Sequence, residues 1–220
     1  MISLDIDGVL YLPNFSNKEQ QEEFKKVFAY SLNLDKVDNK DWKINIDKYK
    51  SGYVVKFLYD SKMLGAWVVF DIPFQKIDLE LLRSLNEKAE KIFREEWFYG
   101  VKDREALEAL LARVDNGFFG FEPYPTTISK AKVFWYTIAS KQMFNNGNKR
   151  TALLIALTFL NLNGYILDFE DSNELYNISM NLANKIMSED ELEQYLLTHV
   201  RIDFEQMEEL AKNLEKTSKR

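Results

Sequence analysis

The sequence predicts a mainly α-helical protein that begins with a small α+β unit, and two observations support this fold class. Segments 42–49, 52–59 and 63–71 are rich in β-branched and aromatic residues and are separated by turn signals, as strands are. After Pro73, apolar residues recur at helical spacing in almost every segment. We therefore expect a small α+β domain of unknown role over residues 1–74 and a helical bundle domain over residues 75–220.

The first domain is expected to contain a hairpin, a helix and the three strands. The apolar segments on either side of Asp7-Gly8 favour a hairpin, because this dipeptide is a strong two-residue turn signal. Asn17 begins a helix with one apolar face. The last two strand segments are joined by a turn at Asp60-Ser61.

The second domain is expected to consist of helices joined by short loops. One helix is capped at its start by Thr127 and carries Gln142 on its apolar face. The next helix is apolar nearly all round, which is typical of the centre of a bundle, and ends at Asn163-Gly164. The expected helices cover residues 79–92, 104–112, 127–142, about 148–163, 173–186, 190–200 and 204–214, and a loop rich in aromatics covers 116–125.

The composition favours a soluble globular protein in a reducing compartment. The chain has 220 residues, of which 46% are hydrophobic and 29% charged, and it has no cysteine, so disulfides and thiolate chemistry are excluded. A net charge of −6 disfavours nucleic acid as a partner. The longest apolar run is too short to span a bilayer, and the N-terminus lacks the basic region of a signal peptide. We expect a cytoplasmic protein, no membrane contact, and a solvated helix face at the acidic run 87–96.

The most informative motif is a polar loop that runs directly into an apolar helix, Phe144-Asn145-Asn146-Gly147-Asn148-Lys149-Arg150. A helix N-terminus is a positive end, so Lys149 and Arg150 lie where the macrodipole disfavours cations. A bound anion removes this conflict, because the backbone N–H groups of residues 147–149 and the two cations together form a phosphate cradle. The alternative is a charged cap on a core helix, but Ser or Asp alone would cap a helix more simply.

These residues resemble the signature of the Fic/Doc family, which runs His, any, Phe, any, Asp/Glu/Asn, Gly/Ala, Asn, Gly/Lys, Arg. Positions 142–150 here read Gln-Met-Phe-Asn-Asn-Gly-Asn-Lys-Arg, and the resemblance covers about residues 77–200. The lysine at position 149 resembles the residue found at this position in the Doc (death-on-curing) branch. The resemblance implies a helical Fic/Doc-like fold, ATP and Mg²⁺ as cofactors, and transfer of phosphate, or less favoured AMP, to a Ser, Thr or Tyr of a cytoplasmic protein such as a translation factor.

The resemblance also implies roles for single residues. Asn146 occupies the metal-ligand position, where a neutral carbonyl oxygen would bind Mg²⁺ only weakly. Phe144 would point into the core and anchor the loop. Lys149 and Arg150 would neutralise phosphate oxygens during catalysis. The phosphate-binding residues would be Gly147, Asn148 with its side-chain amide, Lys149 and Arg150.

Gln142 stands where the family has its catalytic His. A carboxamide does not accept a proton near neutral pH, and loss of a general base typically costs ~10²–10⁴-fold in rate. Three explanations are open: an engineered replacement, a natural enzyme whose loose transition state needs little base assistance, or a protein that has kept the cradle and lost catalysis. The chain is then either a Doc-like toxin of a toxin–antitoxin system or a catalytically silent nucleotide- or protein-binding regulator. His199, the only histidine, is expected to be structural.

Three further features complete the interpretation. The family's inhibitory helix motif has no match, so the resemblance implies inhibition by an antitoxin or another partner chain. The aromatic segment 118–124 occupies the place of the family's target-docking flap, or it is an ordinary loop. Residues 4–10 resemble the first motif of haloacid dehalogenase-like phosphatases, but the region before Pro73 is too short for the long parallel sheet that such a site needs.

Overall fold

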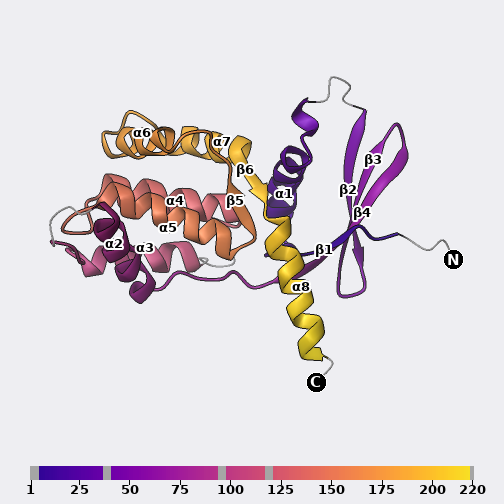
Figure 1. The fold of residues 1–220 in the computed structure, drawn as a ribbon, viewed down its shortest axis with the longest axis horizontal. Helices are drawn as coiled ribbons and strands as arrows, with labels where there is room; N and C mark the ends of the chain where they lie inside the picture. Colours follow the sequence, from indigo (N-terminus) through magenta and orange to yellow (C-terminus); the bar gives the residue numbers. More distant parts are fainter. Residues whose placement is uncertain (1–4, 37–40, 94–97, 117–120, 219–220) are drawn as a thin grey trace.

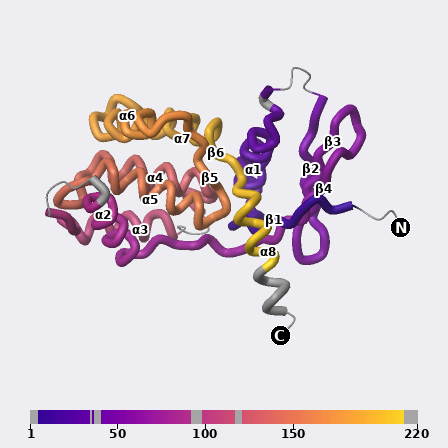
Figure 2. The backbone as a smooth tube through the Cα atoms, in the orientation of Figure 1, coloured from indigo at the N-terminus to yellow at the C-terminus, as the bar shows by residue number. Residues whose placement is uncertain are grey.

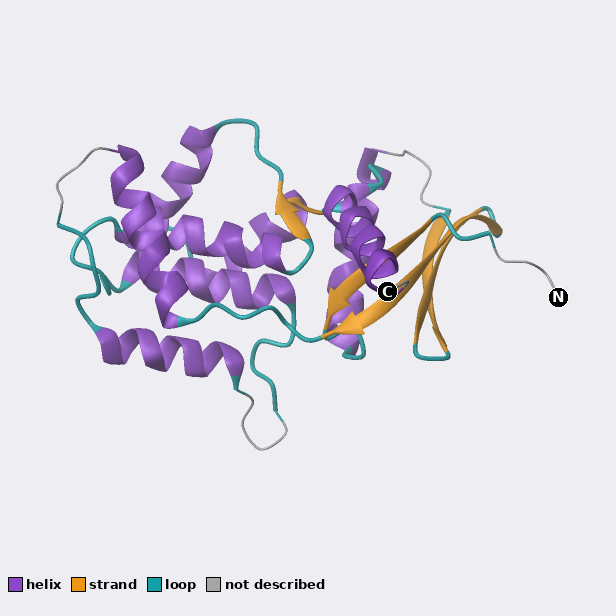
Figure 3. Ribbon diagram, turned by 60° about the horizontal axis from the view of Figure 1, so that its bottom comes forward, coloured by secondary structure: helices purple, strands orange, loops and turns teal. Residues whose placement is uncertain are grey.

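The computed structural model describes residues 5–36, 41–93, 98–116 and 121–218. Strands and helices are segregated: a four-stranded sheet lies at one end of the molecule and most of the helices lie at the other (Figure 1, Figure 3). The helix that follows the first strand and the C-terminal helix lie between these two ends, as the path of the backbone in Figure 2 shows. The predicted fold class, mainly α with a small N-terminal α+β unit, is confirmed.

The three predicted strands are present, and a fourth strand completes the sheet. The turn at Asp60-Ser61 has φ values of 48° and 60°, the left-handed conformation that a two-residue hairpin favours. Helix α1 (Lys18–Ser31) begins after its N-cap Asn17, as predicted, and places Phe28 edge-on against Trp67, with the ring centroids 4.9 Å apart. A short 3-10 turn, η1 (Leu34–Lys36), follows. The strands are β1 (Gly8–Pro13), β2 (Trp42–Tyr49), β3 (Gly52–Tyr59) and β4 (Lys62–Ile72), in the spatial order β1-β4-β3-β2.

The prediction of a hairpin at Asp7-Gly8 is wrong. Gly8 is the first residue of β1 and pairs in parallel with Trp67 of β4. The Asp7 N–H donates to the Ala66 carbonyl oxygen (2.8 Å), and Asp7 Oδ2 accepts the Ala66 N–H (2.7 Å). The backbone of β1 is therefore satisfied by a strand distant in sequence rather than by a local turn. Residues 1–4 of the expected first strand lie outside the described residues. The described part of the sheet has one parallel strand pair, β1–β4. It is therefore not the long parallel sheet that the phosphatase interpretation requires.

The helical part is built around two adjacent helices, α4 (Thr127–Ser140) and α5 (Asn148–Leu162). Trp135 of α4 is fully buried and donates its indole N–H to the hydroxyl of Ser179 (2.9 Å). Phe134 and Phe159 bring the two helices together, with ring centroids 5.5 Å apart. The surrounding elements are α2 (Leu79–Phe93), α3 (Arg104–Asp115), β5 (Tyr165–Leu167), α6 (Ser172–Ala183), α7 (Glu189–His199), β6 (Val200–Ile202) and α8 (Phe204–Ser218). No helix in the described ranges has both the length and the apolar character that crossing a bilayer demands.

Helix α4 differs from its predicted limits at both ends. Its N-cap is Thr126 rather than Thr127, and the Thr126 side chain forms a capping box with Ser129. The helix ends at Ser140, where the N–H of Lys141 bonds to the Thr137 carbonyl oxygen (3.0 Å). Gln142 therefore does not lie on a face of α4. It belongs to the following loop and has a left-handed φ of 41°.

The N-terminal unit contacts the helical part through buried polar groups at the start of α4. Gln20 Oε1 of α1 accepts the N–H of Thr127 (2.9 Å), and the Glu23 carboxylate accepts the N–H of Ile128 (3.1 Å). These two side chains of α1 bond N–H groups of the first turn of α4, which have no partner within their own helix. Burial raises the pKa of Glu23 to about 7. The domain boundary near residue 74 stays a prediction.

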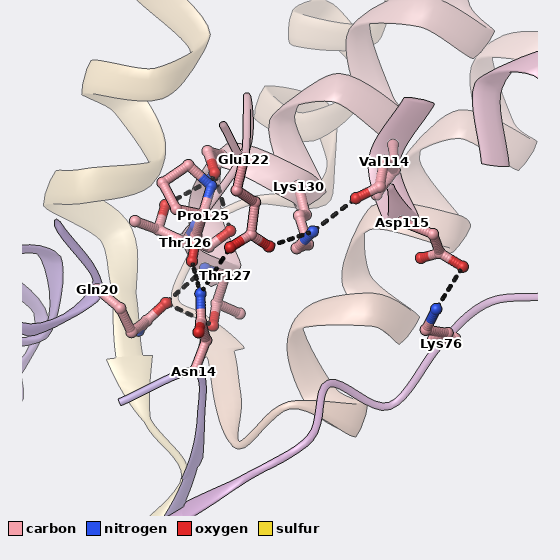
Figure 4. Close-up of polar contacts among 11 residues, drawn as sticks. Asn14, Gln20, Lys76, Val114, Asp115, Glu122, Pro125, Thr126, Thr127 and Lys130 are labelled. Carbon is pink, nitrogen blue, oxygen red and sulfur yellow. Dashed lines mark hydrogen bonds and ion pairs between the residues drawn. The ribbon is translucent and has the colours of Figure 1, made fainter. Parts of the chain in front are cut away.

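A second group of polar contacts lies beside this junction (Figure 4). Asn14, which follows β1, donates from Nδ2 to Glu122 Oε2 (3.1 Å) and to the Pro125 carbonyl oxygen (2.8 Å). Glu122 also lies 3.3 Å from the Lys130 ammonium, whose side chain is 3% exposed. Burial lowers the pKa of Lys130, and the neighbouring Glu122 opposes this effect. On β1 itself, Met207 Sδ of α8 accepts the N–H of Tyr11 (3.3 Å).

Candidate functional site

The motif loop joins α4 to α5, and its own side chains fix its shape. Asn148, the first residue of α5, donates from Nδ2 to the carbonyl oxygen of Phe144 (2.9 Å) and accepts the Phe144 N–H at Oδ1 (2.8 Å). Asn146 Oδ1 accepts the N–H of Gly147 (2.8 Å). These bonds close the loop immediately before the helix. The Asn148 amide, which was expected to face phosphate, is bonded to the loop backbone in this structure.

Gly147 is the N-cap residue of α5 and adopts the left-handed conformation, with φ 70° and ψ 17°. This conformation favours glycine, because a side chain there would be strained. No side chain caps α5, although the other helices with assigned caps in the described part have a capping side chain. No described side chain therefore caps the first turn of α5, and its use as an anion site stays a prediction, whereas the Gly147 N–H of the predicted cradle donates to Asn146 Oδ1 (2.8 Å).

A buried asparagine of α2 holds the loop from the other side. Asn86 is fully buried and donates from Nδ2 to the Asn146 carbonyl oxygen (3.0 Å) and to the Thr151 hydroxyl (2.9 Å). Its Oδ1 accepts the N–H of Gly100 (2.8 Å). The Gly100 carbonyl oxygen in turn accepts the N–H of Asn145 (2.9 Å). One side chain thus ties together α2, the segment before α3, the motif loop and the first turn of α5.

The loop is also anchored in the core. Met143 and Phe144 are 2% and 1% exposed. The Met143 carbonyl oxygen accepts the N–H groups of Lys102 (3.0 Å) and Asp103 (3.1 Å), and Phe144 forms a β-bridge with Val101. Phe144 therefore lies where the resemblance implies an anchor, and the loop backbone has partners on both sides.

An internal carboxylate lies at the N-terminus of α5. Glu90 of α2 is 1% exposed, and its Oε1 lies 2.9 Å from Nη2 of Arg150. A Cβ on Gly147 would come within 1.9 Å of the same Glu90 oxygen, so the carboxylate packs directly against the N-cap of α5. Neither Glu90 oxygen has a well-formed hydrogen bond within the described residues. The conflict noted in the sequence, cations at a positive helix end, is therefore offset in this structure by a buried side-chain anion.

The other motif residues are open to solvent. Lys149 is partly exposed and forms no ion pair within the described ranges. Gln142 is exposed, and its side chain makes no hydrogen bond to any described residue. Its left-handed backbone costs on the order of 1 kcal/mol for a residue other than glycine. The buried anchor residues Met143 and Phe144, which follow directly, hold the loop in this conformation and offset the cost.

The arrangement can hold phosphate more readily than a resident metal ion. The uncapped helix end and Lys149, together with Arg150 once Glu90 moves away, match phosphate oxygens in charge and geometry. Asn146, the expected metal ligand, offers one carboxamide oxygen that already accepts the N–H of Gly147. No cluster of three or more carboxylate or histidine side chains that could hold a metal occurs in the part of the chain the structure describes.

Two residues of the site escaped the sequence interpretation, Asn86 and Glu90. The acidic run 87–96 was expected to be a solvated helix face, and for Glu90 this prediction is wrong. The side chain of Glu87 is 41% exposed, whereas that of Glu90 is 1% exposed and faces Arg150. The spacing of the apolar residues in α2 gave a partial signal, because residues 82, 85, 86, 89 and 90 lie on one face.

The remaining candidate residues lie outside the site or outside the description. His199 at the end of α7 stacks on Tyr195, with ring centroids 4.1 Å apart, and its Nδ1 lies 2.8 Å from the Tyr195 carbonyl oxygen. These contacts fit the structural role expected of it. Residues 118–120 of the expected docking flap lie outside the described residues. In the rest of that segment Phe121 is 68% exposed.

Comparison with known proteins matches this site to a family. Residues 76–160 match the model of the Fic/DOC family, a range that includes α2, the motif loop and nearly all of α5. The chain is also similar to Toxin Doc of Mycolicibacterium smegmatis, with 35% identity over 81 residues, which is 35% of this chain and 62% of that protein. The chain thus spans about three fifths of the length of this curated relative. Residues 76–160, which contain the motif loop, are thus similar to the Fic/DOC family.

Proposed function

We propose that the chain is a Doc-like toxin of a toxin–antitoxin system that acts in the cytoplasm. In this proposal it transfers phosphate from ATP, or less favoured AMP, to a hydroxyl of a protein such as a translation factor, and a partner chain restrains it. The observation that carries the proposal is the uncapped N-terminus of α5, with Lys149 and Arg150 in its first turn. The similarity to a curated toxin of another organism supports the biological class.

The residues of the loop would divide the work of phosphoryl transfer. Backbone N–H groups of the first turn of α5 would hold phosphate oxygens, and Lys149 and Arg150 would balance their charge. Lys149 favours phosphate over AMP, because in the Doc branch a lysine here goes with a reversed nucleotide pose. Asn86, Asn148 and Gly147 would keep the loop in shape. Their hydrogen bonds are already made in this structure, so little ordering is left for the bound state.

The transfer step itself needs little assistance from a base at position 142. The target oxygen forms a bond to the γ-phosphorus, the bond from this phosphorus to the bridging oxygen breaks, and ADP leaves with that electron pair. The hydroxyl proton is lost late when the transition state is loose, so it can pass to solvent or to a phosphate oxygen. A reduced but measurable rate is therefore expected with Gln142 in place of a base.

The second candidate function is a catalytically silent regulator that binds nucleotide or a protein. Two observations favour it: Gln142 cannot act as a base, and Glu90 already pairs with Arg150. This hypothesis predicts ATP binding without turnover and no growth defect when the protein is expressed.

Label transfer from ATP carrying the tracer in the γ-phosphate, with a bacterial lysate as acceptor, tests the proposal. A labelled protein band that disappears in Arg150→Ala supports the phosphotransferase. Lys141→Ala is the matched control, since Lys141 is an exposed cation that precedes the motif. A band that persists in Arg150→Ala would contradict the assignment. No band with the unchanged chain, but one with Gln142→His, would identify a disabled enzyme, and no band with either would favour the binding module.

A further inference from the structure

Strand β2 is an edge strand whose outer side is unpaired in the described structure. It lies at the end of the order β1-β4-β3-β2. The Asp60 N–H bonds to the Asp41 carbonyl oxygen (3.3 Å), which shows that the odd-numbered residues here bond toward β3. The alternate backbone groups therefore point away from the sheet. They belong to Trp42, Ile44, Ile46 and Lys48, and no hydrogen bond to them is found among the described residues.

The two edges of the sheet are treated differently by the fold. Helix α8 lies against the β1 edge, where Met207 accepts the outward N–H of Tyr11 (3.3 Å). No element of the described chain covers β2 in the same way, and Lys43, Asn45, Asp47 and Lys48 are exposed. An unpaired edge is a template for a further strand unless charges or bulges prevent pairing.

The sequence of β2 is complementary to itself when two copies run antiparallel about Asn45. In this register Lys43 faces Asp47 of the second copy, and Ile44 faces Ile46 of the second copy. Each pair occurs twice because the axis is two-fold. The outward backbone groups of Ile44 and Ile46 then meet as hydrogen-bonded pairs, so the register also satisfies the ladder. On one face Lys43 and Asp47 match in charge, and on the other Ile44 and Ile46 match in apolar character, with Trp42 facing Lys48 of the second copy beyond them.

Neighbouring registers lose this match. With the axis at Ile44, Asp47 would face Asp41 of the second copy, which places like charges opposite each other. With the axis at Ile46, Lys48 would face Ile44, and no pair of opposite charges forms. Lysines on an edge strand ordinarily prevent pairing. Here Lys43 favours one register, because only there does it face Asp47 of the second copy.

We propose that β2 pairs with β2 of a second copy of this chain and joins the two four-stranded sheets into one across a two-fold axis. Asp47 is held in position for this contact by Lys56 of β3, whose ammonium lies 2.8 Å from its carboxylate. The contact is one strand wide, so a reversible dimer at micromolar concentrations or above is expected. The proposal does not depend on the function proposed for the motif loop.

Sedimentation velocity of the full chain over a concentration series tests the charge match. The natural chain is expected to show a monomer–dimer equilibrium. Lys43→Asp turns two attractive cross-strand pairs into repulsive ones and should weaken the dimer about tenfold or more. The swap Lys43→Asp/Asp47→Lys should restore it, and Lys48→Asp, which meets no charge in this register, should leave it unchanged. A natural chain that stays monomeric, or a dimer indifferent to Lys43→Asp, would overturn the proposal.

Disulfide trapping tests the register independently, because the natural chain has no cysteine. Asn45 would face its own copy in a non-hydrogen-bonded pair, with Cα atoms about 4.5 Å apart, which a disulfide can bridge. Asn45→Cys should therefore cross-link under mild oxidation. Lys48→Cys is the matched control, since its copies would lie about 20 Å apart in this register. Equal cross-linking of the two variants would refute the register.

Discussion

Replacing Glu90 by Gln should strengthen nucleotide binding and weaken the fold. Glu90 is 1% exposed and its Oε1 lies 2.9 Å from Arg150, whose side chain is 19% exposed. Phosphate oxygens that reach Arg150 and the N-terminus of α5 must approach this carboxylate or displace it. Gln keeps the size of the side chain and removes its charge, so the variant separates repulsion from packing.

The structure sets the expected magnitudes. Two like unit charges about 5 Å apart repel by about 3 kcal/mol at an effective dielectric of about 20, so Glu90→Gln should bind ATP roughly a hundredfold more tightly. Breaking a buried ion pair costs about 3–5 kcal/mol when the remaining charge stays dry. Arg150 reaches solvent, so a loss of about 1–3 kcal/mol in the free energy of unfolding is expected.

Titration calorimetry with ATP and Mg²⁺, together with urea unfolding, measures both effects. Glu87→Gln is the control on the same helix, because Glu87 is exposed and pairs with Lys91 rather than with the motif. Glu90→Asp, which keeps the charge, should bind ATP about as weakly as the natural chain. A folded Glu90→Gln protein that binds ATP no more tightly than the natural chain would refute the reasoning.

Three further predictions follow from single side chains. Gln142→His should raise label transfer by ~10²–10⁴-fold by supplying a base, and an unchanged rate in γ-label transfer would count against the enzyme. Because burial raises the pKa of Glu23 from 4.5 to about 7, the folded state binds more protons than the unfolded state between these values, so stability falls as pH rises through this window. The change is about 3 kcal/mol at most, and urea unfolding at pH 5 and 7.5 should show it in the natural chain but not in Glu23→Gln. Asn148→Ala removes both hydrogen bonds to Phe144 and should cost about 1–3 kcal/mol, measured by thermal unfolding against the exposed control Asn145→Ala.

Local sequence patterns were sufficient to predict strands whose pairing partner lies next to them in sequence. Strands β2, β3 and β4 form a meander, so alternation and the turn at Asp60-Ser61 predicted them almost to the residue. The same reasoning failed at Asp7-Gly8, because β1 pairs with β4 about sixty residues away and no local feature encodes that pairing. A dipeptide typical of hairpins can equally begin an edge strand.

The candidate site shows the same division between local and distant information. The motif predicted the loop and the cations at the start of α5, whereas the left-handed conformation of Gly147 was learned from the structure. Asn86 and Glu90 were missed because their burial depends on residues of the motif about sixty positions later. In a charged helix such as α2, the sequence does not show which acidic residue is buried, because this depends on the residue that it contacts. The end of α4 before Gln142 was missed because Ser140-Lys141 carries no helix-breaking residue.

The contacts that shape the loop do not include Gln142, the residue that stands where the family has its catalytic base. Asn148, Asn86 and Phe144 hold the loop through backbone and buried contacts, and none of these contacts involves Gln142, which is exposed. The shape of the loop therefore does not depend on the side chain at position 142, and a histidine placed there would not have to rebuild it. Glu90, in contrast, acts on the anion site directly through Arg150. Binding and turnover should thus respond to different substitutions: ATP affinity to residue 90, and the rate of transfer to residue 142. A double variant, Glu90→Gln/Gln142→His, should combine the two gains additively in free energy, since the two side chains share no contact in the described structure.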